Sequence, residues 1–490
     1  MAKKVLYIIA RAGGWDGCAM QGEIWIEILV KNKYNISLLT GMFEEESDNF
    51  FPYNKINIIK NGDLSLESEA NLYHNGFEDK YDRKPWIKAF LKNKGEIKNE
   101  IAEYFKSHDI IILHNISLRY LIPSLWAALY ELSVEYPEKK IISIEPDSPY
   151  ERRYLLNKYS SEVLYMLNHP STWYNKNNRA ICSTLNNINK RSLKMLPGPI
   201  HRENTYHVVL NAYQYNAHRD IFGIPESNLV KIPDIGRFNK KQTKYSEQEL
   251  LDYFLENQIM CPKKAIMPED LFFISPVRPV YRKNIKYLIK VMAQFRIYLY
   301  DKKGLSPNLF MIITHINKDD KDYFWSLVEL AEELDITIIY LGDSLKLRRL
   351  RRRNVKIYDE VLEMLSNRKS ICFSASAFGG WENAVVECSE KHIPVFVNPK
   401  IPVFGDMVRM GYIYHIIPFI NMPNIKDFPS TKLWESNYSF ELFLENIYSF
   451  FYDMSLRKKI TDHNYNIGLK YQAMKYLESD LIIPLLRKNH

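Results

Sequence analysis

Length and composition already restrict what this chain can be. Its 490 residues are 46% hydrophobic, which supplies cores for two domains and excludes a disordered chain. The net charge of +8 is modest for this length and does not by itself indicate a nucleic-acid partner. No uninterrupted apolar run approaches the roughly 18 residues that a membrane span requires, and the five cysteines show neither pairing nor metal-site spacing. We therefore expect a soluble protein of the reducing cytoplasm, with contact to a membrane surface left open.

The first half of the chain alternates short apolar runs with longer helical stretches. This alternation is typical of a parallel sheet whose strands are joined by helices, the doubly wound α/β arrangement. The helical stretches include residues 19–31, 86–106 and 119–135. The expected strands are residues 5–10, 35–40, 55–60, 109–114, 140–145 and 206–211.

Ligands of such sheets bind where the strands end at their carboxyl side, so the loops there hold the first candidate residues. Gly14 belongs to a glycine-rich loop after the first strand, although a tight turn that needs a positive φ explains much of that pattern without a ligand. His114 ends the fourth expected strand, and Asn115 after it either binds a ligand or caps the next helix. Glu145 and Asp147 stand at the end of the fifth.

The second half repeats the alternation after the segment 229–238, where Pro233 and Gly236 are expected to end one domain and let the next begin. The sequence therefore predicts two Rossmann-like domains. The expected strands of the second domain are residues 271–276, 308–314, 336–342, 355–360, 370–375 and 394–398.

One charged segment of the second half follows the strand 271–275. Arg278 and Lys283 stand between this strand and an amphipathic helix that turns Leu288 and Met292 inward. Alone, two cations near a helix start usually form a solvated face.

A second segment, residues 374–394, joins a Gly379–Gly380 turn to a helix that begins near Asn383. The free N–H groups and positive dipole end of this helix would attract an anion, and the glycines let the backbone approach it closely. Glu387 lies one turn into the helix, where its carboxylate could accept hydrogen bonds from a ribose diol. The alternative is a strand–loop–helix packing unit with a solvated acid.

Together, the two segments resemble the family 4 retaining glycosyltransferases of the GT-B fold. The resemblance rests on Arg278, Lys283, Gly380, Asn383 and Glu387, which match in order and spacing. It implies two Rossmann-like doubly wound domains that face each other across a cleft, with a C-terminal helix that returns to the first domain. The implied bounds are 1–235 plus about 466–490 for the acceptor-side domain and 236–465 for the nucleotide-sugar-binding domain.

The resemblance also implies a role for each matching residue. Arg278 and Lys283 would grip the donor diphosphate, where two fixed cations stabilise the charge of the leaving group without a metal. Glu387 would bind the ribose, and Trp381 would stack on a sugar where the family usually has Phe. The substrate is a nucleotide-sugar such as a UDP- or GDP-sugar, and no cofactor or metal is expected. The donor-binding set is then Arg278, Lys283, Gly379, Gly380, Trp381, Asn383, Glu387 and Gly14.

The chain departs from the family pattern at two places. Pro146–Asp147 stands where many relatives have a His-Asp dipeptide, and Gly379 occupies the position of the first acid in the Glu-x7-Glu motif. Glu382 or Glu145 could supply the displaced carboxylate. The candidate catalytic residues are therefore Glu382, Asp147, Glu145 and His114.

The acceptor and two alternative functions stay open. A metal-dependent mechanism would need an Asp-x-Asp pair, and the plausible string, residues 320–322, is typical of an acidic helix start. The run 346–354 contains six cations and either faces solvent or meets a polyanion. The acceptor is thus a carbohydrate, a lipid-linked molecule or nucleic acid. The alternatives are a glycosyltransferase that acts on modified DNA or another polyanion, and a sugar-nucleotide-binding protein that has lost catalysis.

Overall fold

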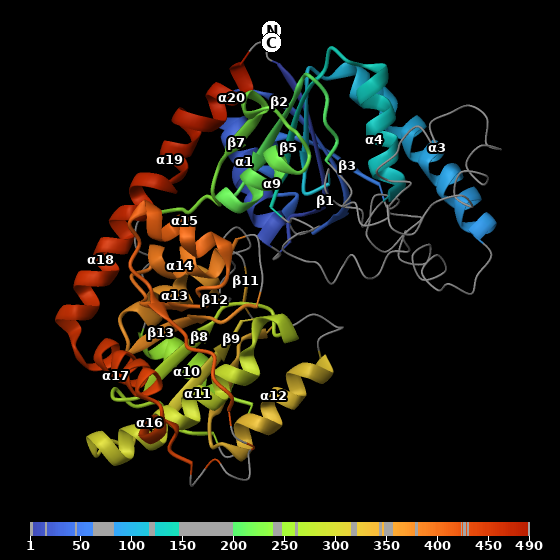
Figure 1. Cartoon of the computed structure of the whole chain (residues 1–490). Coiled ribbons are helices and arrows are strands. Elements are labelled where there is room, and N and C mark those ends of the chain that lie inside the picture. Colours follow the sequence, from blue (N-terminus) through green and yellow to red (C-terminus); the bar gives the residue numbers. More distant parts are fainter. Residues whose placement is uncertain are drawn as a thin grey trace. The chain divides into compact units, whose positions relative to one another are not determined.

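A computed structural model shows that the chain folds as two compact units, Met1–Pro233 with Leu481–His490, and Asp234–Asp480 (Figure 1). Each unit is built around its own parallel sheet. The residues that the structure describes are 3–14, 17–44, 47–61, 83–116, 123–146, 199–238, 247–259, 263–314, 321–342, 345–346, 356–377, 381–422, 424, 428 and 431–488.

The sheet of the first unit has seven parallel strands in the order β3-β2-β1-β4-β5-β6-β7. The chain starts in the middle of the sheet and proceeds to both edges, which is the doubly wound arrangement that the sequence predicts. Strand β4 is buried at every position, because a parallel sheet is covered on both faces. The strands are β1 Lys4–Ala12, β2 Asn35–Phe43, β3 Asn57–Lys60, β4 Ile110–His114, β5 Lys140–Glu145, β6 Thr205–Val209 and β7 Leu229–Lys231.

Helices cover both faces of this sheet. On one face, Leu6 and Ile8 of β1 belong to the same core as Ile101 and Leu125. Ile9, the next residue along, points to the other face, where a side chain at Gly22 would lie 2.9 Å from it. The helices of this unit are α1 Gly17–Lys31, α3 Arg83–Ser107, α4 Pro123–Glu135, α9 Ala212–Asp220 and α20 Ile483–Arg487.

The sheet of the second unit has six strands in the order β10-β9-β8-β13-β14-β15. Aromatic side chains fill its core; the rings of Phe273 and Phe373 on neighbouring strands stack with centroids 5.6 Å apart. The strands are β8 Leu271–Ser275, β9 Leu309–Ile313, β10 Thr337–Tyr340, β13 Ser370–Ser374, β14 Val395–Val397 and β15 His415–Ile416.

The helices of the second unit complete its layers. Leu288 and Met292 of α11 are fully buried, as their spacing predicts. The helices are α10 Glu247–Glu256, α11 Ile285–Tyr298, α12 Lys321–Glu333, α13 Tyr358–Ser366, α14 Asn383–Glu390, α15 Pro402–Met410, α16 Leu433–Ser436, α17 Tyr438–Tyr452, α18 Met454–Tyr471 and α19 Met474–Leu477.

One expected strand of the second unit is wrong. Within residues 355–360, only Lys356–Ile357 form a strand, β12, which pairs with β11, Leu345–Lys346, outside the main sheet. Helix α13 begins directly afterwards, at Tyr358. Val361, Leu362 and Leu365 are buried. The helical spacing of these apolar residues extends beyond the short strand-like run at 355–360, so the segment folds mainly as a helix.

A single aromatic side chain fixes the start of the second unit. Side chains added at Gly236 and Gly468 would lie 2.3 Å and 2.1 Å from the ring of Phe238, so both positions accept only glycine next to this ring. The N–H of Gly236 also donates to the carbonyl of Gln472 at 3.0 Å. The segment around Gly236 therefore packs against the end of α18 within the second unit.

The last residues of the chain, Leu481–His490, belong to the first unit, whereas residues 466–480, which the sequence assigns to that domain, belong to the second. Leu486 of α20 is fully buried. Lys140 at the start of β5 donates to the carbonyl of Lys488 at 2.8 Å and also to the carbonyl of Leu485. Lys488 in turn donates to the carbonyl of Ser227 at 2.8 Å.

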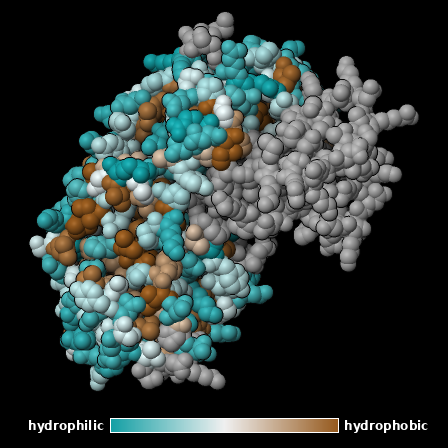
Figure 2. Space-filling model, in the orientation of Figure 1, coloured by the Kyte–Doolittle hydropathy of each residue, from teal (hydrophilic) through white to brown (hydrophobic). Residues whose placement is uncertain are grey.

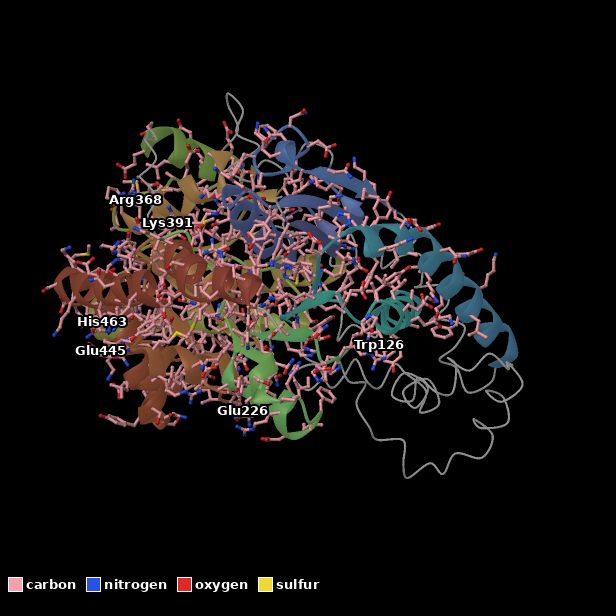
Figure 3. All side chains as sticks on the ribbon, turned by 90° about the horizontal axis from the view of Figure 1, so that it is seen from above. Trp126, Glu226, Arg368, Lys391, Glu445 and His463 are labelled. Atoms are coloured by element: carbon pink, nitrogen blue, oxygen red, sulfur yellow. The ribbon has the colours of Figure 1, made fainter. Side chains whose placement is uncertain are left out.

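The surface is mixed in character. In the coloured part of Figure 2, hydrophilic residues are interspersed with patches of hydrophobic ones. Exposed ion pairs are part of this surface: Glu226 and Glu445, labelled in Figure 3, contact Arg219 and Lys303 at 3.2 Å and 3.0 Å. Among the described residues, no helix combines the length and apolarity needed to span a membrane.

Candidate functional site

The turn that carries Lys283 is fixed beside the end of β13. Asn284 adopts a left-handed backbone conformation with φ of 52°, and its side-chain amide donates to the carbonyl of Ala375 at 2.8 Å. The N–H of Ala377 donates to the carbonyl of Arg282 at 2.7 Å. These two hydrogen bonds join the loops after β8 and β13. The carboxyl ends of adjacent strands thus bring the two sequence segments together, as expected for a ligand site in a parallel sheet.

Lys283 and Glu382 form a buried ion pair at this place. The Lys283 Nζ atom lies 3.0 Å from Oε1 and 2.8 Å from Oε2 of Glu382. The exposed fractions of the two side chains are 10% and 1%. Because little water reaches the pair, the attraction between the charges is stronger than on the surface. The geometry therefore confines the Lys283 charge next to the start of α14.

The N-terminus of α14 keeps its anion-binding character. Glu382 is the residue before the helix, but its side chain makes no capping hydrogen bond, because the carboxylate turns to Lys283. The helix spans eight residues, Asn383–Glu390, and its first N–H groups and dipole favour an anion.

Polar atoms without a partner among the described residues mark the same region. Buried side-chain atoms rarely lack a hydrogen bond, so a group of them at a strand end indicates a missing ligand or water. Asn383 Oδ1 begins α14, and Trp381 Nε1 precedes it. Ser374 ends β13, and Ser275 ends β8. The atoms are Ser275 Oγ, Ser374 Oγ, Trp381 Nε1 and Asn383 Oδ1.

The remaining donor-side candidates lie on the same two segments of the chain as this pair. Arg278 is exposed in the loop after β8. Glu387 is half-buried and lies one turn after Asn383 on the same side of α14. Gly379 and Gly380 lie outside the described residues.

In the first unit, the glycine loop is anchored rather than open. Gly13 has a φ of 75°, a conformation that favours glycine, and its N–H donates to the Tyr53 hydroxyl at 3.2 Å. The hydroxyl of Ser47 donates to the carbonyl of Gly13 at 3.1 Å. Gly14 follows, and no atom of the described residues lies within 4 Å of the place where its side chain would start. The backbone at Gly14 therefore has room for a close ligand.

His114 ends β4 in the interior of the first unit. Its Nδ1 atom is hydrogen-bonded to the Tyr7 hydroxyl at 2.5 Å, and burial raises the pKa of Tyr7 well above its usual value. The side-chain amide of Asn115 donates to the sulfur of Cys18 at 2.8 Å. Asn115 itself is left-handed, with φ of 58°. The expected polar pair at this strand end is therefore built into the fold, with its imidazole held by Tyr7.

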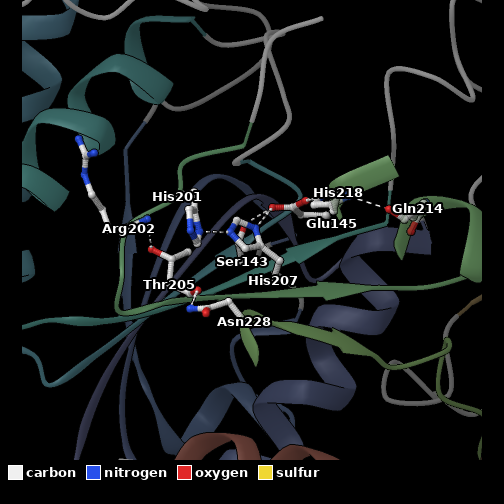
Figure 4. Close-up of polar contacts among 9 residues, drawn as sticks. All are labelled: Ser143, Glu145, His201, Arg202, Thr205, His207, Gln214, His218 and Asn228. Atoms are coloured by element: carbon white, nitrogen blue, oxygen red, sulfur yellow. Dashed lines mark hydrogen bonds and ion pairs between the residues drawn. The ribbon is translucent and has the colours of Figure 1, made fainter. Parts of the chain in front are cut away.

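Glu145 has a different setting from the expected one. It joins His207 of β6 and His218 of α9 in a cluster whose three side chains have no exposed surface (Figure 4). Glu145 Oε1 accepts from Ser143 Oγ at 2.7 Å and from His207 Nδ1 at 3.0 Å, and Oε2 contacts His218 Nε2. A carboxylate so enclosed by the protein positions its neighbours and does not contact a substrate. Asp147, two residues later, lies outside the described residues.

Hydrogen-bond partners decide where the protons of this cluster sit. His218 Nδ1 lies 2.9 Å from the carbonyl of Gln214, which only accepts, so this nitrogen donates. Its other nitrogen faces the Glu145 carboxylate, and His218 is therefore a doubly protonated cation paired with Glu145. Burial alone would raise the pKa of Glu145, but the positive charge of His218 and the hydrogen bonds from His207 and His218 outweigh burial and hold the pKa well below its usual range.

The other two histidines of the cluster are neutral. Burial lowers the pKa of His207, despite the attraction of Glu145. Burial and then repulsion from His207 lower the pKa of His201 to about 4. His201 Nδ1 and His207 Nε2 are 3.0 Å apart, so a neutral His201 donates to a neutral His207.

The same cluster is a candidate metal centre by composition. The ligand atoms of Glu145, His207 and His218 lie within 4.8 Å of one another, and two histidines with one carboxylate are a common zinc set. The spacing between His207 Nδ1 and Glu145 Oε1, 3.0 Å, is that of a hydrogen bond with a shared proton. The geometry therefore favours a hydrogen-bonded cluster over a metal centre at this position.

Sequence reasoning did not find His207 and His218. The two residues lack metal-ligand spacing, and His207 stands inside an apolar strand. One signal was available: Ser143 of β5 lies directly opposite His207 of β6, so two polar residues interrupt neighbouring buried strands on the same side. Buried polar residues need partners, which predicts a polar cluster there.

Solved structures define the class of this fold. HepE from Anabaena, in complex with UDP and glucose, superposes with a TM-score of 0.58 at 12% identity over 99% of this chain and 100% of that one. A glycosyltransferase from Rickettsia africae gives a TM-score of 0.57 at 12% identity over 100% of both chains. The chain therefore has the GT-B fold with two Rossmann-like domains, as predicted.

The sequence comparison agrees with the fold. No family model matches the chain. The mannosylglucosylglycerate synthase of Thermotoga maritima is 21% identical over 490 residues, 98% of this chain and 98% of that protein. This similarity to a sugar-transferring enzyme points in the same direction as the resemblance carried by Arg278, Lys283 and Glu387.

Proposed function

We propose that this enzyme transfers a sugar from a nucleotide-sugar to a hydroxyl acceptor, with retention of configuration and without a metal ion. The observation that carries the proposal is the start of α14. There, Lys283 is fixed beside a helix N-terminus that lacks a side-chain cap. Ser275 and Ser374 at the ends of β8 and β13, and Trp381 and Asn383 at the start of α14, supply polar atoms that have no partner among the described residues. A diphosphate needs cations and N–H donors, and a sugar needs hydrogen-bonding groups.

Each residue of the site has a proposed task. Lys283 and Arg278 hold the diphosphate and stabilise the charge that develops on it as the glycosidic bond breaks. Glu387 accepts hydrogen bonds from the ribose. Trp381 and Glu382 contact the transferred sugar. The resemblance implies that the diphosphate itself draws the acceptor proton, so the transfer requires no further cofactor.

Within the first unit, His114 and Asp147 are the proposed acceptor-side groups, together with the backbone at Gly14. Glu145 is instead a positioning residue, because its carboxylate is enclosed by His207 and His218.

We propose a small carbohydrate as the first acceptor to test. The relative from Thermotoga maritima is named for a mannosylated product of glucosylglycerate, so a mannose donor with glucosylglycerate is the first pair to try. The cationic run 346–354 motivates a second test with DNA as the acceptor, whose binding would weaken steeply with salt.

We place the enzyme in the cytoplasm because Cys18, Cys372 and Cys388 form no disulfide in the described part of the chain.

The test is a panel of UDP-, GDP- and ADP-sugars read by thermal unfolding, followed by transfer assays with the donor that binds. A ligand at a hundred times its Kd adds about 2.7 kcal/mol to the stability of the folded protein. We expect one nucleotide class to stabilise the enzyme. Failure of all of them at millimolar concentration contradicts the proposal. Binding without transfer over a broad acceptor panel would favour a protein that has lost catalysis.

Variants locate the donor site. Arg278→Ala and Lys283→Ala should each weaken donor binding by roughly 10- to 100-fold, because charge-assisted hydrogen bonds contribute about 1.5–3 kcal/mol. Arg296→Ala is the matched control, since Arg296 lies in the last turn of α11, where it pairs with Asp335. Unchanged donor binding in both Arg278→Ala and Lys283→Ala would remove the diphosphate assignment.

A further inference from the structure

The Lys283–Glu382 pair raises a question about charge. Lys283 is the buried cation proposed to receive the diphosphate, yet both oxygens of Glu382 already contact it at 3.0 Å and 2.8 Å. The Glu382 side chain is 1% exposed, so water screens it very little. The positive charge of Lys283 is therefore already neutralised by Glu382. An incoming phosphate would have to contact Lys283 at the place that the Glu382 carboxylate occupies.

The donor phosphate and the Glu382 carboxylate cannot both form close contacts with Lys283. Phosphate and carboxylate oxygens are like charges, and in a poorly solvated site their repulsion is much stronger than in water. The backbone beside Lys283 is held by the hydrogen bonds of Asn284 to Ala375 and of Ala377 to Arg282. Donor binding at Lys283 therefore requires the contact between the Glu382 and Lys283 side chains to loosen.

We infer that Glu382 is an internal counter-ion that occupies Lys283 in the empty site and releases it to the donor diphosphate. This inference rests on the proposed function, because it presumes that the donor binds beside α14. Release leaves a buried carboxylate without its cation, which is unfavourable unless new donors reach it. The hydroxyl groups of a donor sugar are such donors. Glu382 would then exchange one partner for another within the same site.

This exchange distinguishes an intact donor from the nucleotide alone. A nucleoside diphosphate takes Lys283 but offers Glu382 nothing in return, whereas a nucleotide-sugar brings hydroxyl groups for the released carboxylate. The pair therefore disfavours the product nucleotide relative to the substrate. Glu382 is then a specificity-determining residue, because it favours binding of the intact nucleotide-sugar over binding of the nucleoside diphosphate.

The test compares two proteins and two ligands by calorimetry. The proteins are the full-length enzyme and Glu382→Gln, which keeps the size of the side chain and removes its charge. The ligands are a nucleoside diphosphate and its sugar conjugate, chosen as UDP, GDP or ADP according to the thermal panel. Glu445→Gln is the matched control, because Glu445 also pairs with a lysine, Lys303, at 3.0 Å, on another helix of the same unit.

The expected result is a change in the ratio of two dissociation constants. In Glu382→Gln, the Kd of the nucleoside diphosphate should fall by roughly ten-fold, since a competing charged contact is gone. The Kd of the nucleotide-sugar should change much less, because the lost carboxylate also served the sugar. Glu445→Gln should leave both constants as in the wild type.

The outcomes separate this inference from the proposed function. If the wild type binds neither ligand and Glu382→Gln binds neither, the donor site itself is wrong. If the wild type binds both and Glu382→Gln binds the diphosphate no more tightly, the exchange is wrong and the donor site stands. Circular dichroism checks that the variant folds. If Glu382→Gln does not fold, Glu382→Asp replaces it, because the shorter side chain loosens the pair. In Glu382→Asp, the Kd of the nucleoside diphosphate should fall relative to that of the nucleotide-sugar, by less than in Glu382→Gln. An unchanged ratio of the two dissociation constants in this variant equally overturns the inference.

Discussion

Among the described residues, each unit has a buried ion pair near the carboxyl ends of its strands, and the two pairs differ in what surrounds them. In the first unit, Glu145 pairs with His218 and also accepts from Ser143 and His207. In the second, the carboxylate of Glu382 contacts Lys283, and polar atoms of Trp381 and Asn383 close by in sequence have no partner among the described residues.

The difference separates a structural pair from the proposed ligand site. A buried charge is stable when the protein supplies all its hydrogen bonds, and Glu145 has three donors within the fold. A region with unmet hydrogen bonds is stable only with water or a ligand in it. Burial and charge alone do not distinguish the two pairs. The surrounding hydrogen bonds tell them apart.

The largest expected effect is on the Glu145 cluster. Glu145→Ala leaves the His218 cation buried without its counter-ion, which should lower the free energy of unfolding by about 3–5 kcal/mol. Chemical denaturation measures this change. Glu226→Ala is the control, because Glu226 forms an exposed ion pair with Arg219 and should cost less than about 1 kcal/mol. Equal effects in the two variants would contradict the structural role of Glu145.

A smaller effect is expected at Glu387, on the ligand side of the comparison. Glu387→Gln weakens the acceptor of the ribose hydroxyls, so the Kd of the donor should rise by roughly 5- to 30-fold, about 1–2 kcal/mol. The unfolding temperature without ligand should stay close to that of the wild type, since Glu387 is half-buried on α14. Isothermal titration with the donor measures the change in Kd. A structure of the donor complex with Glu387 turned away from the ribose would contradict the proposed ribose contact.

The smallest expected effect is a pH dependence from His201. Its pKa is lowered to about 4 in the folded protein, so the unfolded chain, with a pKa of about 6.5, binds its proton first. The His201 contribution is therefore complete above pH 6.5 and is lost as the pH falls toward 4. In His201→Asn, unfolding curves measured between pH 7 and 5 should show a shallower loss of stability. Parallel profiles for variant and wild type would show that His201 does not titrate in this way.

Much of the fold was predictable because its strands are nearly continuous apolar runs. Strands β4, Ile110–His114, and β5, Lys140–Glu145, lie where the sequence places them, since burial on both faces leaves few other choices. Residues 355–360 were not predictable in the same way. A short β-branched run there leads into the helix α13, and local pattern cannot decide between a strand and a buried helix over so few residues.

By itself, the sequence determined the doubly wound architecture and the two segments that carry Arg278, Lys283 and Glu387, because these depend on residue order and spacing along the chain. The tertiary structure decided which charges meet. It paired Lys283 with Glu382 across 99 residues, and it enclosed Glu145 between His207 and His218. Such partners come from strand order and loop packing. A carboxylate has the same sequence signature whether the fold surrounds it with donors or leaves it beside a ligand site.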